Sequence, residues 1–161
     1  MSHSQNGWTA GTAQAIGGLD TSPVPGTAIR LPRGVRKGDV TTVLLFVAEQ
    51  FHLTVEPLHA KQCWGYAYRK VRGSSTVLSN HASGTAIDLN APAHPLGRTG
   101  TFTVKQVAAI HTILVRCEGA VRWGGTYTGR KDEMHFEIVQ DASDVALVAK
   151  KIRFVRSGHD H

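Results

Sequence analysis

Residues 79–91 read SNHASGTAIDLNA, and this stretch combines a loop histidine with an aspartate inside an apolar run. The alternation in its second half predicts a short strand over 85–91. Burying an unpaired carboxylate is very costly, so Asp88 needs a partner, and a metal ion is one such partner. Because a turn at Gly84 can bring the chain back on itself, His81 can lie beside Asp88.

A second histidine with an acid nearby occurs in DEMHFE, residues 132–137. His135 lies in a β-like run, three positions after the first acid. Two imidazoles and one carboxylate suit Zn²⁺ and leave a fourth position for water, as in catalytic zinc sites. The extra acid can take a proton from that water. Two simpler readings stay open: Asp88 caps a turn or pairs with Arg69, and His135 is a hydrogen-bonded core histidine.

The rest of the chain alternates helical and extended patterns. We expect helices over about 40–52, with Asp39 as N-cap, over 103–117, and after a cap at Ser143 or Asp144. We expect strands over 63–71, 85–91, 120–125 and 134–139. This order predicts an α+β fold, with a small antiparallel β-sheet flanked by about three helices.

Both ends of the chain lack such patterns. Residues 1–38 are rich in Gly, Ser, Thr and Pro and predict an irregular N-terminal arm, whereas 157–161 predict a frayed tail. A length of 161 residues favours a single domain over 1–161. There is no recognisable signal peptide and no run of about 18 apolar residues, so we expect no membrane insertion.

The composition narrows the possible partners and metal sites. A net charge of +6 favours polyanions, either nucleic acid or an acidic bacterial surface. The basic residues form no block of five or more, which disfavours a nucleic-acid-binding arm. Cys63 and Cys117 form no CxxC pair, which excludes a cysteine-rich zinc site. Two buried thiols are favoured over a disulfide.

SNHASGTAID resembles the S-x-H-x-x-G-x-A-x-D signature of the VanY-like family of zinc D-Ala-D-Ala carboxypeptidases and L-alanyl-D-glutamate endopeptidases. DEMHF resembles the second motif of that family, an acid, two residues and a histidine. WGYAYR at 64–69 and WGG at 123–125 resemble the segments that precede the two motifs. The resemblance covers roughly 60–139 in the expected order. NGW near the start and DLNAPAHPLG after the first motif resemble endolysins of phages that infect actinobacteria.

The resemblance implies a hedgehog/D-Ala-D-Ala peptidase-like fold and a zinc centre. It implies three Zn²⁺ ligands, His81, Asp88 and His135. Asp132 matches the catalytic acid, whereas Glu133 is offset by one position, which on a strand turns it to the opposite face.

The resemblance also suggests residues that contact the substrate or orient the ligands. Arg69 matches an arginine that holds or polarises the substrate carbonyl, with Arg72 as its rival. Ser79 and Trp123 are candidate substrate-binding residues and, with Asn80, candidates for orienting the ligands.

The implied function is zinc-dependent hydrolysis of the peptidoglycan stem peptide. We expect an L-alanyl-D-glutamate endopeptidase acting as a phage endolysin, with a D-alanyl-D-alanine carboxypeptidase or dipeptidase as the alternative. The complete ligand set disfavours a non-catalytic wall-binding module, and a nucleic-acid binder rests on charge alone. We expect a monomer that is made in a host cytoplasm and released to the cell wall, or is extracellular.

Overall fold

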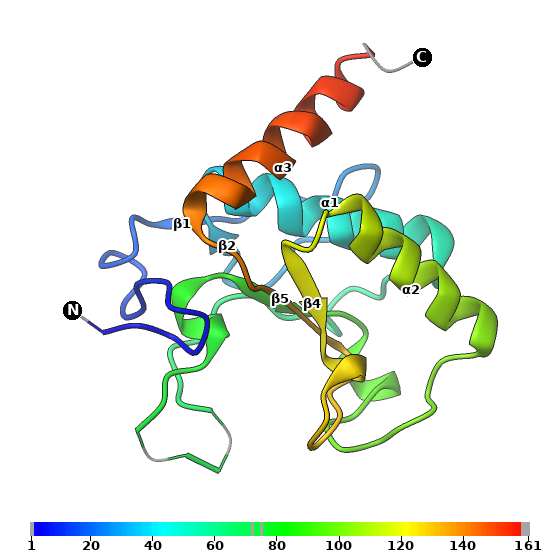
Figure 1. The fold of residues 1–161 in the computed structure, drawn as a ribbon, viewed down its shortest axis with the longest axis horizontal. Helices are drawn as coiled ribbons and strands as arrows, with labels where there is room; N and C mark the ends of the chain where they lie inside the picture. The colour runs from blue at the N-terminus through cyan, green and yellow to red at the C-terminus, as the bar shows by residue number, and fades with distance from the viewer. Residues whose placement is uncertain (1, 72, 75, 159–161) are drawn as a thin grey trace.

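Helices cover one side of a small antiparallel sheet in the computed structural model, which describes residues 2–71, 73–74 and 76–158 (Figure 1). Within these residues the α-helices are α1 (Asp39–Thr54), α2 (Val104–Arg116) and α3 (Ala142–Arg156). The strands are β1 (Leu19–Asp20), β2 (Val35–Arg36), β3 (Ala86–Asp88), β4 (Val121–Trp123) and β5 (His135–Ile138). Short 3-10 helices span Asn80–Ser83, Ala91–Ala93 and Gly124–Thr126. The predicted α+β class is confirmed.

The main sheet has the order β3-β5-β4, and both strand pairs are antiparallel. Phe136 and Ile138 of β5 are fully buried in the core shared with the helices. Because side chains alternate along a strand, His135 and Glu137 point to the other face. Residues directly opposite each other share a face, so Asp88, paired with His135, joins them there. One face of the sheet therefore builds the core, and the other carries polar groups.

The core centres on α1, which packs against α2 and α3. Phe51 of α1 meets the rings of Phe102 and Phe136 edge to face, each at 6.0 Å between centroids. At α2 the expected capping box is present, because Thr103 accepts from Gln106 N and the Gln106 side chain accepts from Thr103 N.

Two predicted caps are wrong. The N-cap of α1 is Gly38, and Asp39 is the first helical residue. The Asp39 carboxylate pairs with Arg153 at 3.0 Å, which ties the start of α1 to α3. At α3 the cap is Asp141, whose Oδ1 accepts from Asp144 N at 3.0 Å, so the helix begins earlier than predicted.

The predicted strand over 63–71 is also wrong, since only isolated bridges form there. Its backbone N–H groups donate to three separate segments: Trp64 N to Asp88 O, Tyr66 N to Gly34 O, and Ala67 N to His81 O. A regular strand would need one continuous neighbour instead. This segment therefore lies beside the outer edge of β3 at Trp64 and then leaves it.

Within residues 2–38, β1 and β2 form their own small antiparallel pair. Asn6 anchors this N-terminal arm, because Nδ2 donates to Thr85 Oγ1 at 2.7 Å and to Ile138 O at 2.8 Å. Trp8 Nε1 donates to Gln140 O at 2.9 Å. The NGW sequence therefore fastens the arm to Thr85 just before β3, to the end of β5 and to the segment after β5.

Cys63 and Cys117 are free and buried, as expected. Burial raises the pKa of the Cys117 thiol to about 12. No helix among the described residues is long and apolar enough to cross a membrane. Met1, Arg72, Ser75 and the tail residues 159–161 lie outside the described residues.

Candidate metal centre

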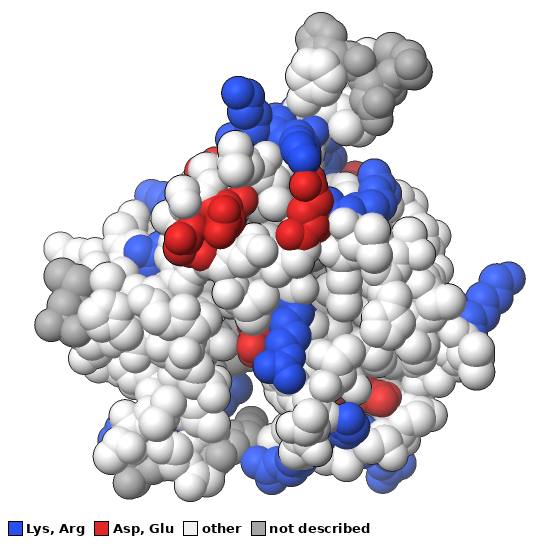
Figure 2. Space-filling model, in the orientation of Figure 1, with Lys and Arg blue, Asp and Glu red and all other residues white. Residues whose placement is uncertain are grey.

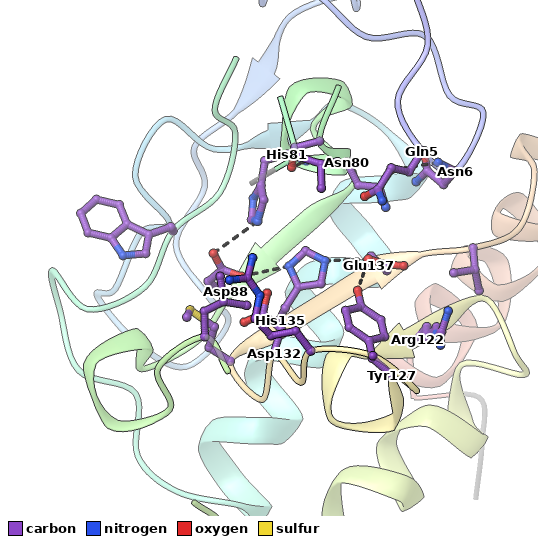
Figure 3. Close-up of a pocket in the computed structure, with 18 of the residues that line it drawn as sticks. Gln5, Asn6, Asn80, His81, Asp88, Arg122, Tyr127, Asp132, His135 and Glu137 are labelled. Carbon is purple, nitrogen blue, oxygen red and sulfur yellow. Dashed lines mark hydrogen bonds and ion pairs between the residues drawn. The ribbon is translucent and has the colours of Figure 1, made fainter. Parts of the chain in front are cut away.

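Three buried side chains meet on the polar face of the sheet: His81, Asp88 and His135 (Figure 3). One potential ligand atom from each lies within 4.8 Å of the others. Asp88 ends β3 and His135 begins β5, and the antiparallel register sets them directly opposite each other. His81 comes from the 3-10 helix Asn80–Ser83, immediately before β3.

The residues on either side of the 3-10 helix hold His81 next to Asp88. Ser79 Oγ accepts from His81 N at 3.1 Å and so caps the 3-10 helix. Gly84 ends that helix with φ +70, and a Cβ there would lie 2.7 Å from Arg36 N. Glycine suits this position because it tolerates both the left-handed conformation and the close approach.

The hydrogen bonds of His81 fix its tautomer. Nδ1 lies 2.8 Å from Gly65 O, and a carbonyl only accepts, so Nδ1 carries the proton. Nε2 then presents a lone pair. It is buried, lies 3.2 Å from Asp88 Oδ2, and has no hydrogen-bond partner among the described residues. Two facing acceptors in a buried site need positive charge between them, which a proton on Nε2 or a bound metal ion can supply.

His135 follows the same logic. Nε2 lies 2.7 Å from Glu137 Oε1, and Nδ1 lies 3.0 Å from Asp88 Oδ1. Tyr127 donates its hydroxyl to the same Glu137 oxygen at 2.5 Å. Without a metal, a protonated His135 ring donates from Nε2 to Glu137 and from Nδ1 to Asp88. With a metal bound, only Nε2 would carry a proton, and the Nδ1 lone pair would be free to ligate. A carboxylate behind a ligating imidazole is the usual arrangement at metal centres.

The electrostatics of the site favour a cation. Burial alone would lower the pKa of His135, but Asp88 and Glu137 raise it to about 10. Burial opposes ionisation of Asp88, yet His81 and His135 hold its pKa below the ordinary value. The site holds the carboxylates of Asp88, Asp132 and Glu137 against two imidazoles. With two nitrogen donors and one oxygen donor facing inward, the residues fit Zn²⁺.

Asp132 lies in the turn before β5 and lines the same cleft. Its Oδ1 is buried without a hydrogen-bond partner among the described residues. Burial raises the pKa of Asp132, and His135 opposes the rise. Asp132 N donates to Gly124 O, and the backbone there approaches so closely that a Cβ on Gly124 would collide with Asp132 O. The WGG sequence thus supports the Asp132 turn.

Glu133 points away from the centre. Its carboxylate accepts from Thr101 N at 2.9 Å, from the Thr101 hydroxyl, and from Gly100 N at 3.2 Å. The Asp132 and Glu133 side chains therefore point in different directions, but strand alternation is not the cause. Both precede β5 and lie in a turn, so strand alternation does not separate them.

The other predicted site residues take different positions. Arg69 lines the cleft, and its charge lowers the pKa of Asp132 against the larger effect of burial. Ser79 also lines it, although its hydroxyl caps the turn of His81. Trp123 is buried in the core, where Nε1 donates to Glu133 O at 2.8 Å. Its indole supports the turn that carries Asp132, and it is absent from the cleft lining. Arg72 lies outside the described residues.

The cleft has a volume of about 740 Å³ and extends beyond the predicted residues. Its lining also includes Gln5, Asn6, Asn80, Trp64, Arg122, Tyr127, Arg130, Met134 and Glu137. Glu137 could have been found from sequence, because it stands two positions after His135 and shares its face in a strand. No sequence signal pointed to Tyr127 or to the arm.

Residues 72–138 match the sequence model of a family described as D-alanyl-D-alanine carboxypeptidase. This segment contains all three candidate ligands and Asp132. Searches of curated proteins and of solved structures found no match to the chain. The family match supports a hydrolase, and the buried His81, Asp88 and His135 suggest that its chemistry depends on a metal.

Proposed function

We propose that this protein is a zinc peptidase that hydrolyses the stem peptide of bacterial peptidoglycan, as an L-alanyl-D-glutamate endopeptidase in the role of a phage endolysin. One observation carries the proposal. His81 Nε2 and Asp132 Oδ1 are both buried without a hydrogen bond among the described residues, in one cleft of the segment that matches the peptidase family. Unpartnered buried polar atoms at one place are typical of a site that binds an ion and a reactant.

Three groups of residues carry the proposed reaction. His81, Asp88 and His135 would hold Zn²⁺, which when bound polarises the scissile carbonyl and makes water nucleophilic near neutral pH. Asp132 accepts the proton of the attacking water at Oδ1 and delivers it to the leaving amine. Arg69, which also lines the cleft, stabilises the negative charge that develops on the carbonyl oxygen.

Glu137 and Tyr127 serve the site indirectly. Glu137 holds the His135 ring through Nε2, and Tyr127 holds the Glu137 carboxylate. Burial raises the pKa of Glu137, and His135, Tyr127 and Asn80 together hold it below its ordinary value. These contacts keep the Nδ1 lone pair of His135 directed at the metal position.

The endopeptidase assignment is supported by the position of the triad within the cleft. Trp64, which is bridged to Asp88, lines the cleft on the β3 side, and Arg122 of β4 lines it on the opposite side of β5. A cleft that continues on both sides accommodates substrate residues before and after the cut bond. The second candidate, a D-alanyl-D-alanine carboxypeptidase, is favoured by the description of the matching family.

Muropeptide cleavage distinguishes the two candidates. Purified zinc-loaded protein is incubated with disaccharide pentapeptides, and the products are identified by mass spectrometry. The endopeptidase leaves the disaccharide bearing only L-alanine and releases a peptide that begins with D-glutamate. Free D-alanine with an intact L-Ala–D-Glu bond would establish the carboxypeptidase instead. Loss of all cleavage in Asp132→Asn, with zinc retained, ties the product to this site.

The basic charge of the protein suggests how it reaches the wall. On the lower half of the face in Figure 2, below the helices α1 and α3, basic side chains cover more of the surface than acidic ones do. We infer that they attract anionic wall polymers, since the net charge is +6. Added salt should then reduce lysis of intact cells more than cleavage of a soluble muropeptide. Equal sensitivity of both reactions to salt would contradict this role.

A further inference from the structure

Arg122 occupies a position in the cleft that the proposed chemistry does not use. It lies on β4 directly opposite Glu137 of β5, so both side chains stand on the polar face of the sheet. The Arg122 side chain is exposed and lines the cleft. Figure 3 shows it beside Tyr127, on the side of His135 away from Asp88.

Arg122 has no acidic partner among the described residues, although Glu137 is its nearest cross-strand neighbour. The Glu137 carboxylate is already engaged by His135 and Tyr127. Three basic residues of α3 behave differently, because Lys151, Arg153 and Arg156 each pair with a carboxylate at 2.6–3.0 Å. The guanidinium in the cleft is therefore free to meet an anion from outside.

Tyr127 prepares Arg122 for such a contact. The guanidinium carbon of Arg122 lies 4.6 Å from the centroid of the Tyr127 ring. That ring is held at its far end by the hydroxyl bond to Glu137. Stacking occupies one face of the guanidinium and leaves its N–H groups in the plane, where they can bind a carboxylate with two parallel hydrogen bonds. Arg130, from the loop that follows Tyr127, adds positive charge to the same lining.

We propose that Arg122, stacked on Tyr127, recognises a free carboxylate of the substrate peptide on the His135 side of the cleft. This inference rests on the proposed function and deepens it. D-Glutamate in a stem peptide is linked through its side chain, so its α-carboxylate remains free unless it is amidated. The cleft consequently selects the acidic form of the stem peptide over the amidated form.

Two synthetic muropeptides that differ only in this group, carboxylate or carboxamide, test the proposal. A hydrogen bond to a charged group contributes enough that wild type should prefer the carboxylate about 10- to 100-fold in kcat/KM. Arg122→Gln should lose this preference mainly through a higher KM, with kcat and zinc content retained. Arg98→Gln is the matched control, since Arg98 is exposed and lies outside the cleft lining. It should keep the preference.

The outcomes separate this inference from the proposed function. Equal cleavage of both peptides by wild type, or a preference that survives in Arg122→Gln, would overturn the role of Arg122 alone. Cleavage of neither peptide would refute the proposed function. In that event, the role of Arg122 is still tested by calorimetry, which measures the affinity of zinc-loaded Asp132→Asn for each peptide. If Asp132→Asn binds the carboxylate form more tightly and the double variant Asp132→Asn/Arg122→Gln does not, the inference is supported. Equal binding of both forms by Asp132→Asn overturns it.

Discussion

His81 Nε2 lies 3.2 Å from Asp88 Oδ2, and neither atom has a proton to offer the other once His81 Nδ1 donates to Gly65. The two atoms are held there by a capped 3-10 turn and by the end of β3. Burial of facing acceptors is costly, so the pair needs added positive charge, which a proton on Nε2 or a bound metal ion would supply.

Zinc binding should therefore stabilise the protein. At a free zinc concentration about 100 times Kd, the free energy of unfolding should rise by about 2.7 kcal/mol. His81→Ala should abolish the thermal shift and leave less than one zinc per chain after dialysis, measured by elemental analysis. His111→Ala, which removes an exposed histidine of α2, should bind zinc as wild type does. An equal thermal shift in His81→Ala would refute the ligand assignment.

Asp132→Asn should retain zinc and lose about 10²- to 10⁴-fold in kcat, the range expected when a general base is removed. The reason is that Asp132 lines the cleft and its buried Oδ1 has no hydrogen-bond partner among the described residues. Glu133→Gln is the control, because its carboxylate binds Thr101 and Gly100 instead. Steady-state cleavage of a muropeptide measures both. A larger loss in Glu133→Gln would move the base to Glu133.

Glu137→Gln should weaken zinc binding about 10- to 100-fold, because carboxylates behind ligating histidines contribute this much to metal affinity. Glutamine keeps the size of the side chain but removes the charge that orients His135. Competition with a chromogenic chelator measures the affinity. Glu118→Gln removes a surface carboxylate that pairs with Lys151 and should leave zinc affinity unchanged. Identical affinities in the two variants would show that Glu137 does not support the site.

Stability should depend on pH through the cap of α3. The Asp144 N–H and the Ser143 hydroxyl hold the pKa of Asp141 below its ordinary value of 3.8. Since the folded pKa is lowered, the stabilisation is complete above the pKa of the unfolded chain and is lost as pH falls through the folded pKa.

Asp141→Asn isolates that effect, because asparagine also caps helices but carries no charge at the helix N-terminus. Wild type should be more stable than Asp141→Asn at neutral pH, and the difference should narrow under acid conditions. Urea unfolding followed by circular dichroism at several pH values measures this difference. A difference that stays constant with pH would contradict the role of the charge.

The N-terminal arm should contribute to stability through Asn6. Asn6→Ala removes both side-chain bonds to Thr85 and Ile138 and should cost about 1–3 kcal/mol, the penalty for polar groups left unpaired. Gln5→Ala is the control, because the Gln5 side chain is exposed and its structural bond is made by the backbone N–H to Leu78 O. Urea unfolding compares the two variants. Equal stabilities would mean that the arm is only loosely attached.

Several features follow from local sequence alone. The capping box of Thr103 and Gln106 was predicted and is confirmed, because both partners lie within one helical turn. The α+β class followed from the order of helical and extended patterns. The proposed ligands His81, Asp88 and His135 were chosen from two motifs, and the structure brings all three together.

Other features depended on partners far away in the chain. The alternating pattern of 63–71 predicts a strand, yet its N–H groups find acceptors in three separate segments. The contacts among Glu137, Tyr127 and Arg122 form only in the folded sheet. Strand β5 must lie between β3 and β4, and the loop after β4 must bring Tyr127 to Glu137. Local pattern thus determined which residues could bind a metal. Tertiary structure decided their tautomers, their supporting hydrogen bonds and the free guanidinium beside them, because these depend on atoms brought together across the sheet.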